Sequence, residues 1–251
     1  MRKVLFGNHS TQMPAIAQYL DHARYEASFA PLDAVDLARF DLVVPLKVAQ
    51  IDAARAADAM HPRRAVLPTA ELVALADDKL AFNRWLIDHG FGAHVPELLE
   101  DGAGVYPHIV KGAHGDFGAG IQLVRSAEEE RPLPDGGFRQ RAIAGHHEDV
   151  LHMVRIGGRI VFRLAYRYDM GVDLSVRGQA DAPRGIAPVE AGDALAPCEA
   201  ILAALGYEGT CCFNYKRADG GLFILEMNPR FGGSLVGEVT RYLDAHFDAL
   251  G

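Results

Sequence analysis

The segment that most constrains this 251-residue chain lies near its end, where residues 210–230 read TCCFNYKRADGGLFILEMNPR. Apolar alternation on both sides of residues 219–221, Asp-Gly-Gly, predicts two antiparallel strands joined by a three-residue loop. In that register Asn214 faces Glu226, and Asn228 lies two residues farther along on the same face of its strand. One carboxylate and two amide oxygens are therefore expected to converge on one point.

Three oxygen ligands of this kind suit Mg²⁺ or Mn²⁺. Magnesium usually keeps several waters and completes its shell with substrate phosphates, so a small protein contribution fits a nucleotide-bound ion. The alternative is a solvated polar hairpin face. The metal interpretation is favoured by Arg230 and by the Gly-Gly-Ser turn at residues 232–234, because glycine turns and helix N-termini bind anions.

A second motif is a strand that ends at Lys111 and is followed by a loop with glycines at 112, 115, 118 and 120. Glycine allows backbone N–H groups to approach phosphate oxygens, and the lysine adds a positive charge. Gly115 and Gly118 are thus candidate phosphate-binding positions. The spacing is not that of a P-loop, and a flexible hairpin loop is the alternative interpretation.

The third motif, Gln140 to Glu148, leads into a hairpin that turns at Gly157-Gly158. A two-residue loop places His152 opposite Arg163, with Glu148 on the same strand face as His152. Such a row could bind ribose and an anionic substrate. The alternative is an ordinary exposed sheet face.

The first 68 residues alternate apolar runs with helical patterns, which predicts a small parallel βαβ sheet. The expected strands are 3–6, 40–45 and 65–67, and the expected helices are 14–20 and a stretch ending near 59. A helical pattern follows from 69 to 90, with Asp77 or Asp78 able to cap a helix. We place a domain boundary near Pro68, which gives an N-terminal domain at 1–68 and a second domain at 69–251.

The second domain is rich in strands and has α+β organisation with antiparallel hairpins. Its expected strands are 107–111, 121–125, 138–143, 150–156, 159–166, 211–216 and 222–227. One helix is expected around Cys198 to Leu205, ended by Gly206, and another from Ser234 onward. Residues 169–188 show neither period and predict a long surface loop.

The net charge of −8 disfavours binding to a nucleic acid backbone. No apolar run is long enough for a membrane span, and the N-terminal apolar run stops at Gly7, too early for a signal peptide. The three cysteines lack metal-type spacing and are expected to be buried and reduced. We therefore expect a cytoplasmic protein.

Together these motifs, in this order, resemble the signature of the ATP-grasp superfamily. The matching features are Asp78-Lys79 at a helix start, Lys111 before the glycine loop, the segment 140–148, and Glu226-Met-Asn-Pro-Arg230 twelve residues after Asn214. The branch that it resembles most includes carbamoyl-phosphate synthase, biotin carboxylase and carboxylate-amine ligases. The resemblance implies two α+β subdomains that clasp ATP, preceded by a short Rossmann-like βαβ domain.

The resemblance also implies residue roles. Lys79 and Lys111 would contact phosphates, and Glu148 would hold the ribose. Gln140 and the backbone from Arg141 to Ile143 would read adenine.

For the metal, the matching ligands are Asn214, Glu226 and Asn228. Arg230 matches the arginine that steadies the transferred phosphoryl group or the acyl intermediate. The position of Asn214 usually carries an acidic residue, so one ligand charge is missing.

The implied activity is an ATP- and magnesium-dependent ligase that joins a small carboxylate to an amine through an acyl phosphate. Arg163, Arg177 and Arg184 are candidates for binding the substrate carboxylate, and residues 169–188 are the candidate lid. Two alternatives stay open: a nucleotide-binding module that has lost turnover, and another superfamily activity with a different acceptor. A homodimer is the assembly considered.

Overall fold

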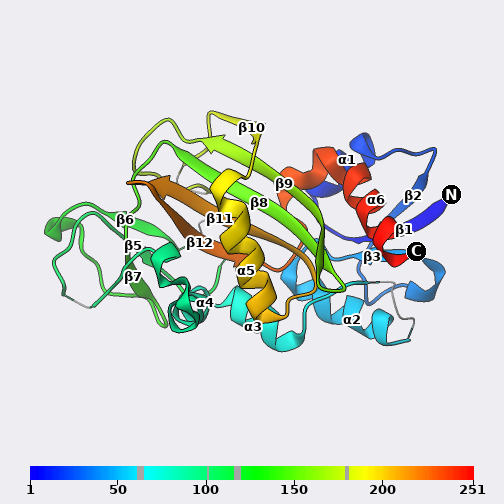
Figure 1. Cartoon of the computed structure of the whole chain (residues 1–251), viewed down its shortest axis with the longest axis horizontal. Coiled ribbons are helices and arrows are strands. Elements are labelled where there is room, and N and C mark those ends of the chain that lie inside the picture. Colours follow the sequence, from blue (N-terminus) through cyan, green and yellow to red (C-terminus); the bar gives the residue numbers. More distant parts are fainter. Residues whose placement is uncertain (61–64, 101, 116–119, 179–180) are drawn as a thin grey trace.

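The computed structural model describes residues 1–251 except 61–64, 101, 116–119 and 179–180. Its N-terminal part is a parallel sheet in the order β2-β1-β3 (Figure 1). The elements there are β1 (Arg2–Gly7), α1 (Gln12–Tyr19), β2 (Tyr25–Ala30), β3 (Leu42–Val44) and α2 (Ile51–Met60). The predicted small parallel sheet is confirmed.

One strand of this sheet was missed and one was wrongly expected. Strand β2 pairs with β1, but its sequence YEASFA mixes polar and small residues because most of its side chains are only half-buried. Residues 65–67 are not a strand. This segment instead passes against Gly209, where an added Cβ would lie 2.6 Å from the Val66 carbonyl oxygen, so it packs without pairing.

The predicted helical stretch after Pro68 consists of two helices, α3 (Ala70–Asp77) and α4 (Lys79–Leu86). Asp78 separates them because its backbone is extended, and its Oδ1 accepts a hydrogen bond of 2.9 Å from the Ala81 amide. The predicted capping by Asp78 is confirmed. Gly90, with φ of 86°, takes the left-handed conformation after α4.

Two antiparallel sheets follow. The first has the order β4-β7-β5-β6, from β4 (Leu98–Leu99), β5 (His108–Lys111), β6 (Gln122–Val124) and β7 (Phe138–Arg141). The second has the order β10-β9-β8-β11-β12. Its strands are β8 (His147–Ile156), β9 (Arg159–Asp169), β10 (Gly185–Val189), β11 (Gly209–Ala218) and β12 (Gly221–Asn228).

Helix α5 (Leu195–Leu205) crosses one face of the five-stranded sheet (Figure 1) and ends, as predicted, at Gly206 with φ of 61°. Cys198, Ile201 and Leu202 of this helix share a core with odd-numbered residues of β8 and β11, such as Met153 and Phe213. Side chains alternate along a strand, so the even-numbered residues of these strands face the other side of the sheet. That other side carries the candidate site.

In both hairpins the observed strand pairing differs in part from the predicted pairing. The loop of the β11–β12 hairpin has two residues, Asp219 and Gly220, whose φ values of 51° and 73° fit a primed turn. A register shift after Asn214 compensates for the shorter loop, so Asn214 still faces Glu226 as predicted.

The β8–β9 hairpin turns at Gly157-Gly158 as predicted, but it contains a register shift between Val154 and Arg155. Because of this bulge, His152 faces Leu164 and not Arg163. Arg163 pairs with Met153 instead.

The expected surface loop at 169–188 is also partly strand, because β10 pairs along the edge of β9. Its sequence GIAPV lacks an alternating pattern since nearly all of its side chains are exposed.

The chain ends in η7 (Gly233–Glu238) and α6 (Val239–Leu250), which pack back on the N-terminal sheet. Phe231, Tyr242 and Phe247 share one buried cluster with Val4 and Phe6 of β1. The division into 1–68 and 69–251 stays a prediction. Among the described residues no helix has both the length and the apolar character to cross a bilayer.

Candidate functional site

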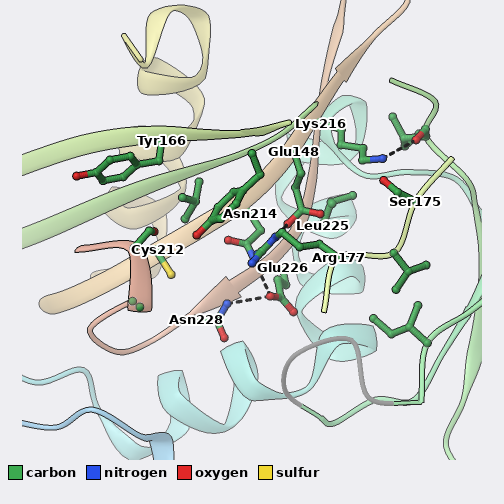
Figure 2. Close-up of a pocket in the computed structure, with 18 of the residues that line it drawn as sticks. Glu148, Tyr166, Ser175, Arg177, Cys212, Asn214, Lys216, Leu225, Glu226 and Asn228 are labelled. Carbon is green, nitrogen blue, oxygen red and sulfur yellow. Dashed lines mark hydrogen bonds and ion pairs between the residues drawn. The ribbon is translucent and has the colours of Figure 1, made fainter. Parts of the chain in front are cut away.

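A cavity of about 600 Å³ lies between the five-stranded and four-stranded antiparallel sheets. Figure 2 shows part of its lining, with side chains from β8, β9, β11, β12 and the segment after β9 pointing toward a common space. Ten of the predicted site residues line it: Lys79, Lys111, Gln140, Arg141, Ile143, Glu148, Asn214, Glu226, Asn228 and Arg230. Gly115 adjoins the lining through its contact with Lys79, and Gly118 lies outside the described residues.

The charge of the cavity is opposite to that of the protein. Basic side chains in the described lining outnumber carboxylates six to two, although the chain as a whole carries a net charge of −8. The basic residues are Lys79, Lys111, Arg141, Arg177, Lys216 and Arg230, and the acidic ones are Glu148 and Glu226. Such a cavity attracts polyanions.

Two lysines approach the cavity from different elements. Lys79, the first residue of α4, donates from Nζ to the Gly115 carbonyl at 2.6 Å, and the same Nζ lies 3.8 Å from Oε2 of Glu226. Gly115 has a φ of 132°, which only glycine adopts readily. Lys79 therefore ties the glycine loop to the centre of the site.

Lys111 is held by the side chain predicted to read adenine. Its Nζ donates to Gln140 Oε1 at 2.9 Å, and Gln140 Nε2 donates to the Pro96 carbonyl at 3.0 Å. Burial lowers the pKa of Lys111 to about 8, although Glu226 acts in the opposite direction. Since both ends of the Gln140 amide are occupied, base recognition would depend on the backbone of residues 141–143.

The three predicted metal ligands do come together. Asn214 and Asn228 each donate from Nδ2 to Oε1 of Glu226, at 2.7 Å and 3.0 Å (Figure 2). Rotating either amide by half a turn would present its oxygen instead. The donor set then holds one carboxylate and two neutral oxygens, which fits a Mg²⁺ ion that shares its shell with phosphates and not an all-protein cage. In the described ranges no group of three His, Cys, Asp or Glu side chains could hold a metal.

Glu148, the predicted ribose ligand, is paired with Arg177. The Arg177 Nε lies 2.6 Å from Glu148 Oε1, and the guanidinium carbon lies 4.3 Å above the ring centre of Tyr168. Burial alone would lower the pKa of Arg177, but Glu148, Tyr168 and Glu226 together outweigh it and the net effect is a raised pKa. Of the three arginines predicted to bind carboxylate, only Arg177 lines the cavity; Arg163 and Arg184 do not.

Lys216 was missed by the sequence reasoning. It is buried on β11, two residues after Asn214, and its Nζ lies 3.4 Å from the carbonyl oxygens of Ile143 and Gly145. Burial lowers the pKa of Lys216. The signal was available, because alternation along β11 places Lys216 on the same face as Asn214.

His152 lies at the other end of the cavity, close to Ser234. Its Nε2 lies 2.8 Å from Ser234 Oγ, and it is 1% exposed, so the exposed-face interpretation is wrong for this residue. Burial, with Arg230 and Arg177 nearby, lowers the pKa of His152 to about 3 and keeps the ring neutral. The exposed-face interpretation does hold for Arg163, whose side chain is 59% exposed.

Gly232 of the glycine turn packs closely against His152. An added Cβ at Gly232 would lie 2.4 Å from His152 Cε1, so residue 232 must be small for the imidazole to keep its place. Arg230 donates to the carbonyl of Phe231 at 3.2 Å and lines the same end of the cavity.

Comparisons with known proteins match the chain through structure alone. No protein-family model and no curated protein sequence matches it. Many solved structures are similar to the chain, and the following three are among those that match nearly all of it. D-alanine–D-alanine ligase from Bacillus anthracis has a TM-score of 0.67 and 14% identity, with 99% of this chain and 96% of the other covered.

The other two are also ligases. Phosphoribosylamine–glycine ligase from Thermotoga maritima has a TM-score of 0.72 and 16% identity, covering 98% of this chain and 76% of the other. L-amino acid ligase from Bacillus licheniformis has a TM-score of 0.62 and 16% identity, covering 95% of this chain and 69% of the other. At these sequence identities the similarity shows the fold alone. The chain has the ATP-grasp fold that its motifs predicted, with two antiparallel sheets around one basic cavity.

Proposed function

We propose that the chain is an ATP- and Mg²⁺-dependent ligase that activates a small carboxylate as an acyl phosphate, which an amine then attacks. The observation that carries this proposal is the order of groups along the cavity. Lys216 and Glu148 lie at one end, the Glu226 group lies in the middle, and Cys212, which pairs with His152 across β11 and β8, lies toward the other end. This order matches the order of groups in a bound nucleotide and its acceptor: base and ribose first, then the phosphates, then the acceptor.

The nucleotide would be bound by the basic part of the cavity. Lys79 and Lys111 would contact its phosphates, together with backbone near Gly115. The backbone of residues 141–143 would read adenine, and Glu148 would accept hydrogen bonds from the ribose after exchanging its partner Arg177. Asn214, Glu226 and Asn228 would hold Mg²⁺, which supplies charge neutralisation at the phosphates when bound.

In the first step a carboxylate oxygen of the substrate attacks the γ-phosphorus, and the bond from that phosphorus to the oxygen bridging to the β-phosphate breaks, so ADP leaves. In the second step the amine nitrogen attacks the acyl carbon, loses a proton to solvent, and expels inorganic phosphate. Lys79, Lys111 and Arg230 lower the barrier by neutralising charge on the phosphoryl oxygens.

No side-chain nucleophile is required. Cys212 is the only thiol in the described lining, and burial raises its pKa to about 11, so it is neutral near pH 7. The neutral state of this thiol favours direct attack by the substrate over covalent catalysis through Cys212.

The test combines nucleotide binding with product formation. Calorimetry should detect ATP binding in the presence of Mg²⁺, and a panel of amino acids and small organic acids with amines should include mixtures that release ADP and phosphate together. Lys111→Met should weaken ATP binding, whereas Arg163→Met, outside the cavity, should not. Absence of ATP binding by the wild-type chain would refute the proposal.

Asn214 favours a second candidate function, a nucleotide-binding module without turnover, because it leaves the metal site with a single carboxylate. If Asn214→Asp creates ATPase activity that the wild type lacks, this candidate gains; if it abolishes an existing ligase activity, the ligase is favoured. A different acceptor would use the same nucleotide residues. We further propose a cytoplasmic location, which the three buried free thiols support, and a homodimer as the assembly to examine.

A further inference from the structure

The floor of the cavity is a set of rows that the strand register fixes. Cys212 of β11 pairs with His152 on one side and Asn228 on the other. The next row along the strands joins Asn214 to Val150 and Glu226. A third row holds Lys216 and, on the neighbouring strands, Glu148 opposite Tyr168.

These rows divide the cavity along its length. In Figure 2 Lys216 lies at one end, Tyr166 and Cys212 lie toward the other, and Asn214 and Glu226 lie between them. If the nucleotide occupies the first two regions, the end near Cys212 is left for the acid. The chemistry of that end therefore describes the acid.

The walls of the acid end are apolar or aromatic. The Tyr166 ring meets the His152 ring edge-on at 6.3 Å. Val236 and Gly237 of η7 line the same cavity, as does Tyr19, the last residue of α1. Helix α1 packs against η7, and Thr240 Oγ1 donates to the Tyr19 carbonyl at 3.3 Å, which places Tyr19 at this end.

Among the described residues that line this end, the polar groups would bind an anion, and none is a carboxylate. Glu238 lies near Tyr166, but it pairs with Arg241 at 3.0 Å and does not line the cavity. Arg230 carries a positive charge, Ser234 offers a hydroxyl, and His152 is neutral. The two carboxylates of the described lining lie in the other rows, where Glu148 pairs with Arg177 and Glu226 accepts from Asn214 and Asn228.

We propose that the acid taken by this site is a monocarboxylate with an uncharged apolar body, and not an α-amino acid. This inference rests on the proposed function. An α-ammonium group is only two bonds from its carboxylate carbon, so Arg230 would attract the carboxylate and repel the ammonium. Removing that ammonium from water without a negative partner would add a further cost.

The experiment uses pairs of acids that differ only in the ammonium group: 3-phenylpropanoate against phenylalanine, and 4-methylpentanoate against leucine. Hydroxylamine replaces the unknown amine. Its nitrogen attacks the acyl phosphate, the bond from the acyl carbon to the phosphate oxygen breaks, and a coloured iron complex reports the hydroxamate. We expect the deaminated acid of each pair to have a kcat/KM at least tenfold higher.

A matched pair of variants tests the physical reason. Val236→Asp adds a carboxylate to the acid end, and Val236→Asn adds a polar group of the same shape without charge. The ratio of the two kcat/KM values should shift toward the amino acid by about tenfold in Val236→Asp and stay near the wild-type ratio in Val236→Asn. The inference is wrong if both variants shift the ratio equally or if the wild type prefers amino acids.

Thermal shift with ADP and Mg²⁺ gives the same comparison without turnover. At equal concentration a deaminated acid should raise Tm more than its amino acid partner, and it should reach half of its full effect at a lower concentration. Calorimetry of nucleotide binding distinguishes a failure of this inference from a failure of the proposed function. Binding of nucleotide without any preference between the acids overturns this inference alone, whereas absence of nucleotide binding overturns the proposed function and this inference with it.

Discussion

Asn214 lies across the β11–β12 hairpin from Glu226 and donates a hydrogen bond of 2.7 Å to its Oε1. In Asn214→Asp two carboxylates would meet at this distance, so without metal the variant should be less stable by about 1–3 kcal/mol. Mg²⁺ should reverse this loss, because the second carboxylate strengthens cation binding.

The measurement is Tm with EDTA and with Mg²⁺. Asn214→Leu is the control, since it removes the hydrogen bond without adding charge and should be destabilised under both conditions. Equal Mg²⁺ effects on the wild type and Asn214→Asp would count against a metal site here.

Glu148 and Arg177 form a buried ion pair in the cavity lining, with side chains 9% and 22% exposed. A double-mutant cycle with Glu148→Gln and Arg177→Met should give a coupling energy of about 1–3 kcal/mol in urea denaturation. The control pair is Arg163 and Glu199, which are 3.7 Å apart and exposed, and whose coupling should stay below about 1 kcal/mol. Similar couplings for the two pairs would contradict the expected effect of burial.

Lys111 predicts a pH dependence of nucleotide binding. Phosphates bind the protonated amine, and burial sets its pKa at about 8, so ATP affinity should be insensitive to this group below pH 8. Above pH 8 the affinity should fall by up to about tenfold per pH unit, because binding must first restore a proton. Calorimetry near pH 9 in buffers of different ionisation enthalpy should show proton uptake.

Lys111→Arg is the control for this prediction, because arginine stays charged throughout the range. Its affinity should change less steeply between pH 8 and pH 9.5. Parallel profiles for the two proteins would show that another group causes the dependence.

Gly232 predicts a sharp difference between neighbouring glycines. Gly232→Ala places a methyl group 2.4 Å from His152 Cε1 and should cost about 1–3 kcal/mol of stability by displacing the ring. In Gly233→Ala the nearest atom to the methyl group is Gln12 Nε2 at 3.8 Å. The free energy of unfolding of that variant should therefore lie within about 0.5 kcal/mol of the wild-type value. Chemical denaturation of both variants decides the question, and equal losses would refute the packing argument.

The sequence predicted those parts of the site that a single hairpin determines. Asn214 and Glu226 could be paired from alternation and a turn signal alone, and a register shift beside Asn214 offset the error in loop length. No such compensation occurred at His152, where the bulge moved its partner from Arg163 to Leu164. Bulges depend on packing between strands and a core, which local sequence does not display.

Contacts between distant segments were harder to predict. Arg177 reaches Glu148 from the segment after β9, and Gln140 of β7 holds Lys111 of the neighbouring strand β5. Neither contact has a spacing in the sequence that distinguishes it. Strand β2 was missed for a related reason, since its half-buried side chains give no clear apolar alternation.

The alternation of β11 separates two tasks within one strand. Its odd-numbered residues anchor helix α5, while Cys212, Asn214 and Lys216 each serve a different part of the cavity. The cavity can therefore change at position 212 during evolution without loosening the helix. Inserting one residue ahead of it would exchange the two sets, turning Phe213 and Tyr215 into the cavity and removing binding and packing together.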